Sequence, residues 1–316
     1  MGSTLRVRKG SATARELSAM SAAALDVPLA GGEDPELWVH EVTSEATVLG
    51  AFERNLDPAS GDVARRGSGG PAILVGPGTV HVALLLGYPG ALVACEPAKL
   101  VNRYVRPLLR ALTKVGATAH YFGRDWISVS HRPAGWVGFA HDARSRRALV
   151  EAFVAVETPF AVASRASFLG KEPGTLASIL GRTLPSGRIV EAVVEAYGSA
   201  YGRSLEAVPS TPPDALASSA SHAVEALDAP WQATCEEVIG TIGAGKDRGG
   251  TFRLGGALLA SRDAVAEVAE RARAIGPSVD ELGAMVDAVL RAPGVAIDGV
   301  RSLESIRDVL FRALAG

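Results

Sequence analysis

The chain has 316 residues, of which 47% are hydrophobic and 21% charged, so it can bury a core larger than that of one typical domain. Its formal net charge of −2 provides no overall positive field for nucleic acid or an anionic membrane surface, so an anion site must be local. No apolar run approaches the roughly 20 residues of a membrane-spanning helix. Cys95 and Cys235 lack the spacing of a metal site, and we expect reduced thiols in a soluble, cytoplasmic protein.

The first part of the chain predicts one helix followed by several strands. Ser11 is a candidate N-cap for a helix whose apolar residues recur at helical spacing as far as Leu25. Strands are expected at residues 37–42, 47–52, from 72 onward and at 79–86, with a tight turn at Gly76-Pro77-Gly78. These segments predict a largely antiparallel sheet.

The middle of the chain predicts a covering helix and further strands. Residues 97–115 have the apolar spacing of an amphipathic helix, with Pro97 in its first turn and a kink expected at Pro107. Short strands are expected at 119–122, 126–130, 136–140 and 149–156, and a helix at 189–201.

The domain boundary is predicted where Ala, Ser and Pro accumulate, between Ser204 and Pro230. We therefore expect a large domain at 1–205, a linker at 206–230 and a C-terminal domain at 231–316. Two strands and three helices are expected in the last part, with a capping box from Ser278 to Glu281.

The segment Gly240–Lys246 has most of a P-loop pattern, but Asp247 stands where that motif needs a hydroxyl for Mg²⁺. The chain also continues into a strand, so no helix N-terminus is available for phosphates. We predict a glycine-rich hairpin here.

The segment Arg65-Arg66-Gly67-Ser68-Gly69-Gly70 has the residue types of an anion-binding loop. Two arginines supply fixed positive charge, and three glycines allow backbone N–H groups to approach an anion closely. The alternative for such a segment in isolation is a glycine-rich hairpin with two solvated arginines.

This segment and its surroundings resemble the lipoate–protein ligase family, which shares a superfamily with biotin ligases and octanoyltransferases. The family motif reads roughly Arg-Arg-x-Ser/Thr-Gly-Gly-Gly-Ala-Val; here Pro71 replaces the third glycine, and Leu74-Val75 replaces a His-Asp pair. Weaker matches keep the family order, at Thr47–Gly50, Gly123–Trp126 and Trp136–Ala140. The resemblance implies an α/β (α+β) fold, a mixed sheet flanked by helices, with a small α+β C-terminal accessory domain.

The resemblance also implies an activity and its residues. A ligase of this kind activates lipoate or a related medium-chain acid as acyl-AMP, using ATP and Mg²⁺, and transfers it to a lysine of a lipoyl-type carrier domain. It implies substrate contacts from the loop and from the strand at 136–140, and nucleotide contacts from two turn glycines and an Arg-Asp pair. The expected substrate-binding residues are Arg65, Arg66, Ser68, Gly69, Gly70 and Gly138; the nucleotide-binding ones are Gly76, Gly78, Arg124 and Asp125, with Asp125 also expected at Mg²⁺.

The family's catalytic lysine is replaced in this sequence. Gly135 occupies the corresponding place, and an alternative registration puts Arg132 there. Lys171 is the other nearby cation, because the family's loop at this point approaches the nucleotide. Lys171 and Arg132 are therefore the candidate catalytic residues, with Lys171 favoured because its glycine-flanked loop could close over a bound nucleotide.

Two hypotheses of different classes follow. The first is an acyl-transferring ligase, favoured by the retained arginines and glycines; the second is a catalytically silent binding protein, favoured by the missing lysine. Cys95, two residues before Pro97 at a predicted helix N-terminus, has two interpretations: a reactive thiolate or a buried structural thiol.

Overall fold

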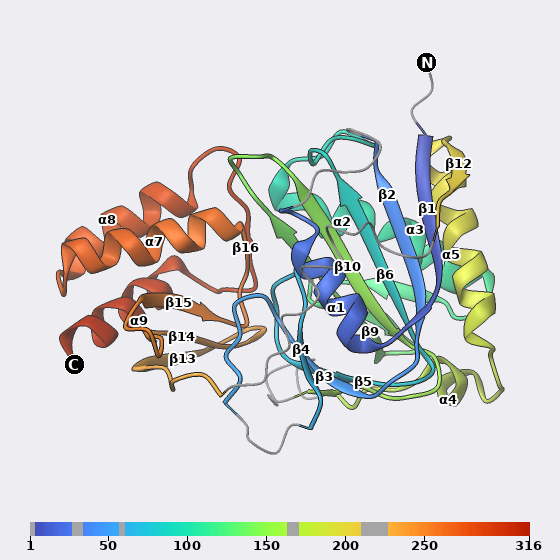
Figure 1. Cartoon of the computed structure of the whole chain (residues 1–316), viewed down its shortest axis with the longest axis horizontal. Helices are drawn as coiled ribbons and strands as arrows, with labels where there is room; N and C mark the ends of the chain where they lie inside the picture. The colour runs from blue at the N-terminus through green and yellow to red at the C-terminus, as the bar shows by residue number, and fades with distance from the viewer. Residues whose placement is uncertain (1–3, 27–33, 57–60, 163–170, 210–226) are drawn as a thin grey trace.

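The large sheet of the computed structural model organises the fold (Figure 1), and the structure describes residues 4–26, 34–56, 61–162, 171–209 and 227–316. β1 pairs in parallel with both of its neighbours, and all other pairs of this sheet are antiparallel. The sheet has eight strands, in the order β12 (Ser204–Ala207), β1 (Thr4–Ala12), β2 (Glu36–Val42), β6 (Thr79–Leu86), β10 (Ala148–Ala155), β9 (Arg132–His141), β8 (Trp126–Val129) and β7 (Ala119–Tyr121).

β1 corrects the expectation for the N-terminus, where the sequence pattern indicated no strand. Leu5 and Val7 are buried, while its other positions include charged residues that hide the strand pattern. Helix α1 (Ala14–Ala23) begins after Thr13, not after Ser11. The Thr13 side chain accepts from the Glu16 amide, and the Glu16 carboxylate accepts from the Thr13 amide, which completes a capping box.

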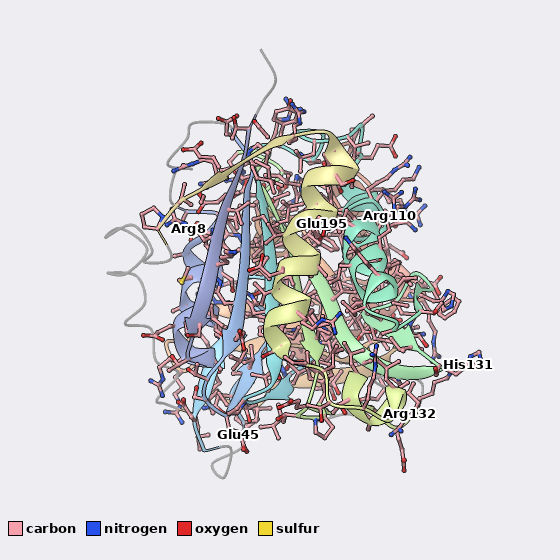
Figure 2. The ribbon with its side chains drawn as sticks, turned by 90° about the vertical axis from the view of Figure 1, so that its right-hand side faces the viewer. Arg8, Glu45, Arg110, His131, Arg132 and Glu195 are labelled. Atoms are coloured by element: carbon pink, nitrogen blue, oxygen red, sulfur yellow. The ribbon has the colours of Figure 1, made fainter. Side chains whose placement is uncertain are left out.

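Helices cover one face of the large sheet (Figure 2), chiefly α2 (Leu100–Tyr104), α3 (Arg106–Lys114) and α5 (Ser186–Tyr201). A 3₁₀ turn, η1 (Pro97–Lys99), precedes α2, and α4 (Leu176–Leu180) precedes α5. The break that Pro107 predicted is present, because α2 ends before Val105 and α3 begins with Pro107 in its first turn. Alternate residues of β6, such as Val80 and Val82, point into this helix-covered core.

The opposite face of the large sheet is covered by α1 and a second sheet, so the expectation of one sheet is corrected to two. The second sheet has the order β11 (Ala161–Val162), β5 (Ile73–Val75), β3 (Ala46–Leu49) and β4 (Val63–Arg65). Trp136 and Phe153 from the large sheet pack with Val48 and Ile73 in the layer between the two sheets. This layer lies beside the glycine-rich loop that follows β4.

The C-terminal part lies to one side of the large sheet (Figure 1) and has a hydrophobic core of its own. The segment that resembled a P-loop is the strand β14, which confirms the predicted hairpin. Ser278 precedes α8, but its side chain accepts no capping hydrogen bond, so the expected capping box is not formed. The elements are β13 (Ala233–Glu237), β14 (Gly240–Lys246), β15 (Phe252–Gly256), β16 (Leu259–Ala260), α7 (Arg262–Ile275), α8 (Val279–Leu290), β17 (Ile297–Asp298) and α9 (Leu303–Ala315).

The two parts share apolar packing. Ile239, Ala257, Leu259 and Ala296 from the C-terminal part belong to the core of the large sheet, and β16 lies against β9. The predicted linker falls largely outside the described residues, and the domain boundaries stay a prediction. Among the described helices, none is long and apolar enough to cross a membrane.

Candidate functional site at the glycine-rich loop

The glycine-rich loop follows Arg65, the last residue of β4, and reaches the free edge of β9. The register of β8 with β9 ends at Trp136, and after the bond from the Val137 amide to the Asp125 carbonyl this edge of β9 is met by the loop instead of a strand. The Gly69 amide donates to the Phe139 carbonyl of β9 at 3.0 Å, and the Gly70 amide donates to the Leu258 carbonyl of the C-terminal part at 2.8 Å. The loop is thereby held between the large sheet and the residues that precede β16.

Every backbone amide from Arg66 to Gly70 donates to an acceptor of the protein itself. The Arg66 amide donates to the Leu49 carbonyl at 3.0 Å, and the Gly67 amide to Ser21 Oγ at 2.9 Å. The Ser68 amide donates to Glu151 Oε2 at 3.4 Å, and the next two amides have the carbonyl partners given above. In this conformation the loop offers no free N–H group to an anion.

Arg66 is fully buried, and its guanidinium holds the loop in place by hydrogen bonds. Its nitrogens donate to three carbonyls: Nη1 to Val48 at 2.9 Å, and Nη2 to Gly69 and Pro71 at 2.8 Å each. The guanidinium carbon also lies 3.8 Å from the centre of the Trp136 ring, a close cation–π contact. Burial lowers the pKa of Arg66 to about 10, so the side chain still carries its charge at neutral pH.

Ser68, Glu151 and His81 form a buried hydrogen-bonded cluster below the loop. Ser68 Oγ donates to Glu151 Oε2, and His81 Nε2 lies 2.8 Å from Glu151 Oε1. Burial alone would raise the pKa of Glu151, but the bonds from His81 and Ser68 and the charge of Arg66 outweigh it and lower the pKa. All three residues have no exposed surface, and the serine faces a carboxylate, so this is no nucleophilic triad.

Sequence reasoning missed Glu151 and His81 as members of this site. A signal was present: Glu151 is the one carboxylate in the apolar strand β10, where a buried charge requires a partner. His81 is the third residue of the neighbouring strand β6.

Two glycines of β9 show why the strand carries no lysine toward the loop. A Cβ added to Gly138 would lie 2.5 Å from the Trp136 ring, so Trp136 fills that space. A Cβ added to Gly135 would lie 3.4 Å from the Ile127 side chain, which belongs to the helix-covered core. A lysine at position 135 would thus point into the apolar core, away from the loop.

Lys171 and Arg132 lie together at the turn between β8 and β9, where Figure 2 shows Arg132 beside His131. Lys171 Nζ donates to the His131 carbonyl at 3.4 Å and lies 5.6 Å from the centre of the Trp126 ring. Trp126 pairs across the strands with Trp136, so its ring is on the loop side of the sheet. Arg132 Nη2 donates to the Pro173 carbonyl at 3.0 Å and is exposed.

Asp125 is fully buried next to the charge of two arginines, and its carboxylate oxygens have no hydrogen-bond partner among the described residues. Burial raises the pKa of Asp125 to about 6, against the opposing influence of Arg124 and Arg66. Arg124 itself donates to the Val238 carbonyl at 2.7 Å.

These surroundings do not fit Mg²⁺. Magnesium needs accessible oxygens and room for its waters, whereas Asp125 has no exposed surface and cationic neighbours. Across the described ranges, no group of three or more His, Cys, Asp or Glu side chains could hold a metal ion. The amides that would receive phosphate oxygens are already bonded.

Gly76 and Gly78 lie in the turn between β5 and β6. Gly78 has a φ of 80°, and its carbonyl accepts the amides of Val156 and Glu157 at 2.9 Å. Gly76 and Gly78 therefore occupy positions in a turn in this structure. Cys95 is half-buried, and burial raises the pKa of its thiol, which favours the structural-thiol interpretation.

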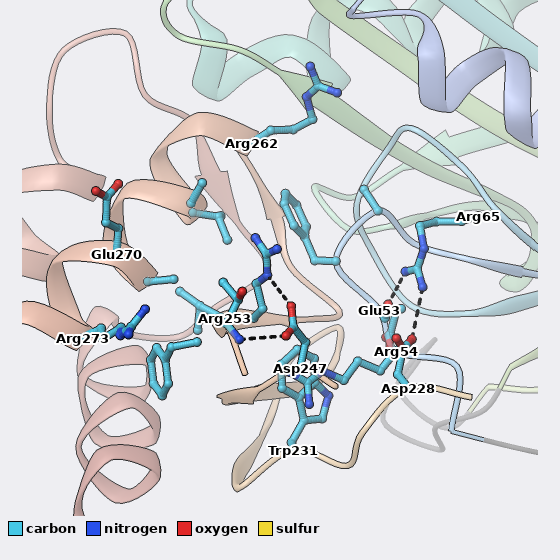
Figure 3. A pocket seen from close by; sticks show the side chains of 18 residues that line it. Glu53, Arg54, Arg65, Asp228, Trp231, Asp247, Arg253, Arg262, Glu270 and Arg273 are labelled. Carbon is cyan, nitrogen blue, oxygen red and sulfur yellow. Dashed lines mark hydrogen bonds and ion pairs between the residues drawn. The ribbon is translucent and has the colours of Figure 1, made fainter. Parts of the chain in front are cut away.

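A groove with a volume of about 710 Å³ lies beside the loop (Figure 3), between residues 51–54 and the elements β15 and α7. Arg65 lines this groove, so the two arginines of the motif diverge: Arg66 enters the core and Arg65 faces the groove. Arg65 donates to the Gly50 and Glu53 carbonyls and lies 3.4 Å from Asp228 Oδ2.

No protein-family profile and no curated protein sequence matches the chain. Among solved structures, P. falciparum LipL1 in complex with lipoate aligns with 98% of this chain and 100% of its own, with a TM-score of 0.64 and 11% identity.

Two structures from Thermoplasma acidophilum are also similar. A bi-partite lipoate protein ligase, studied with its E2 lipoyl domain, aligns with 70% of this chain and 91% of its own, with a TM-score of 0.55 and 14% identity. Protein Ta0514, described as a putative lipoate protein ligase with bound lipoic acid, covers 70% and 93%, with a TM-score of 0.51 and 13% identity. At these identities the likeness establishes the fold: the large mixed sheet with flanking helices is that of lipoate protein ligases, as the sequence predicted.

Proposed function

We propose that this protein is a ligase-fold protein that binds lipoate or a related medium-chain acid without activating it at the glycine-rich loop. The observation that carries the proposal is the closed loop, in which all amides from Arg66 to Gly70 are bonded within the protein. Activation of an acid needs donors that are free to receive the charge of an acyl-phosphate, and loss of one such donor costs about 10²–10³ in rate.

The free-energy cost of opening the loop supports the proposal that the loop does not activate an acid. To free two amides, the bonds of Gly69 to Phe139 and of Gly70 to Leu258 would have to break, at a net cost of about 1 kcal/mol each. To free Arg66 as well, three further hydrogen bonds and the Trp136 contact would be lost.

The identity of the ligand rests on the likeness of fold. Two of the similar structures hold lipoate or lipoic acid, and one of them aligns with almost the whole of this chain. We extend this ligand class to the present protein, together with a cytoplasmic location, as parts of the same proposal.

The second candidate is an active lipoate–protein ligase-like enzyme, which would use ATP and Mg²⁺ and transfer the acyl group to a lysine of a lipoyl-type carrier domain. One observation favours it: Lys171 lies on the loop side of the sheet, against Trp126. Arg132, which donates to the loop at Pro173, is the weaker replacement for the family's lysine. Asp125, the residue expected at Mg²⁺, does not fit that ion, because it is fully buried beside two arginines.

One experiment separates these candidates. Purified protein is incubated with lipoate or octanoate, with and without ATP and Mg²⁺, while calorimetry measures acid binding and mass spectrometry measures acyl-AMP. We expect acid binding without acyl-AMP. If acyl-AMP forms and is lost in Lys171→Ala but kept in Arg132→Ala, the enzyme is the correct assignment. If neither acid binds and no acyl-AMP forms, both candidates are excluded.

A further inference from the structure

The groove beside the closed loop has the dimensions of a small-molecule site. Its volume of about 710 Å³ lies within the ~300–1,000 Å³ of typical ligand pockets. It is also formed where two parts of the chain meet, a common position for such sites. The residues 51–54 supply one wall, and the C-terminal elements supply the other (Figure 3).

The C-terminal wall of the groove is apolar. Phe252 and Leu254 come from the same side of β15, and Val265 and Ala269 lie one helical turn apart on α7. These four residues are almost fully buried, and Phe52 contributes a half-buried ring from the opposite wall. A hydrocarbon chain placed here would exchange water for contacts with the apolar lining residues that are less buried, such as Phe52 and Ala266.

Four of the five arginines that line the groove have partners within the protein. Arg253 pairs with Asp247 at 3.1 Å and Arg262 with Asp26 at 2.8 Å. Arg65 is bonded as described above, and Arg54 donates to carbonyls and stacks 3.6 Å from the centre of the Trp231 ring. These four side chains form part of the groove wall, and their guanidinium groups already interact with partners within the protein.

Arg273 is the exception. It stands exposed to solvent at the rim of the groove, in the last turn of α7, and no hydrogen bond or ion pair engages it within the described part of the chain. Figure 3 shows Glu270 and Arg273 pointing in different directions, with no ion pair between the two side chains. A guanidinium with all its donors available fits a carboxylate, which can accept two parallel hydrogen bonds from it.

The carboxylates that line the groove do not block an anion from binding at Arg273. Asp228 and Asp247 are paired with Arg65 and Arg253, respectively. Burial raises the pKa of Glu53, on the opposite wall, to about 7, so a large fraction of it is neutral at physiological pH. Glu270 also lines the groove, three residues before Arg273, and is exposed to solvent, which screens its charge.

We infer that this groove binds a medium-chain carboxylic acid, with the carboxylate on Arg273 and the hydrocarbon chain along β15 and α7. The class of ligand rests on the proposed function, whereas the place is assigned from the apolar wall and the unpaired arginine. The groove thus takes over the binding role that the closed glycine-rich loop cannot fulfil.

Calorimetric titration of the full chain with octanoate tests the assignment. Arg273→Ala removes the cation and is expected to weaken binding about 10- to 100-fold, the value of a charge-assisted hydrogen bond. Ala266→Trp fills the groove from an exposed position on α7 and is expected to abolish binding. Arg291→Ala, at the exposed C-cap of α8, is the matched control and should leave binding unchanged.

Octanamide separates the two contributions, because it has the same chain without the charge. It should bind more weakly than octanoate and be insensitive to Arg273→Ala. Thermal unfolding of each variant verifies that it is folded.

The outcomes distinguish this inference from the proposed function. If octanoate binds the wild type and both groove variants equally, the groove is the wrong place and the proposed function stands. If octanoate binds in the groove and acyl-AMP is also produced, the groove stands and the silent loop is refuted. If the wild type binds neither octanoate nor lipoate, both are overturned.

Discussion

Gly69→Ala tests whether the glycine-rich loop is held closed by the C-terminal part. A Cβ at this position would lie 2.0 Å from the Leu258 carbonyl oxygen and 3.0 Å from its carbon. Neither atom is the flexible end of a side chain, so the backbone itself must separate. The Gly70–Leu258 hydrogen bond would be lost and the Gly69–Phe139 bond strained.

The expected loss of stability follows from these contacts. Overpacking costs typically about 1–3 kcal/mol, and each lost hydrogen bond adds about 1 kcal/mol. We therefore expect Gly69→Ala to lower the free energy of unfolding by about 2–4 kcal/mol, measured by urea denaturation as a fall in midpoint. Gly90→Ala is the control, because its added Cβ meets nothing closer than 3.6 Å.

The reasoning is refuted if both variants have the wild-type midpoint. That result would mean that the loop is not packed against Leu258 in solution, and the Gly70 amide would then be available to an anion. The silent-loop proposal would lose its main support, and the ligase candidate would take its place.

Three further predictions concern buried charge and the junction. Asp125 has its pKa raised from 3.8 to about 6, so the folded state binds more protons in this window and stability falls as pH rises through it. Asp125→Asn should therefore gain up to about 3 kcal/mol over wild type at pH 8 and nothing at pH 4, by urea denaturation at each pH; an equal difference at both pH values would contradict the assignment. Glu151→Gln leaves Arg66 without its compensating charge and should cost about 3–5 kcal/mol, whereas a loss below 1 kcal/mol would argue against that pairing. Limited proteolysis should cut within 206–230, as the sequence predicts, yet the two fragments should co-elute in gel filtration because they share a core; separate elution would show that the junction is weak.

The sequence predicted the fold better than the state of the site. Pro107 divides the covering helix as expected, since a missing amide and a fixed ring act locally. The sequence did not predict β1, because its charged residues are paired with partners distant in sequence. The Glu36 carboxylate, for example, accepts a hydrogen bond from Arg8.

The loop illustrates the same limit at the candidate site. Its residue types indicate anion binding, but whether amides are free depends on Ser21, Phe139, Glu151 and Leu258, which tertiary structure alone brings near. Arg65 and Arg66 are adjacent in sequence, yet one faces a groove and the other a core. Motif spacing contains no information on that difference.

The attachment of the loop to Leu258 has a consequence for how the protein is made. A ribosome adds about 5–20 residues per second, so Leu258 emerges on the order of ten seconds or more after Gly70. During that interval the nascent chain contains the glycine-rich loop and Arg66 but not the carbonyl that closes over them, nor the apolar residues of the C-terminal part that complete the large core. The large sheet therefore cannot finish folding ahead of the rest of the chain. A message truncated upstream of this point would yield a product that lacks the Leu258 acceptor and leaves part of the large core uncovered.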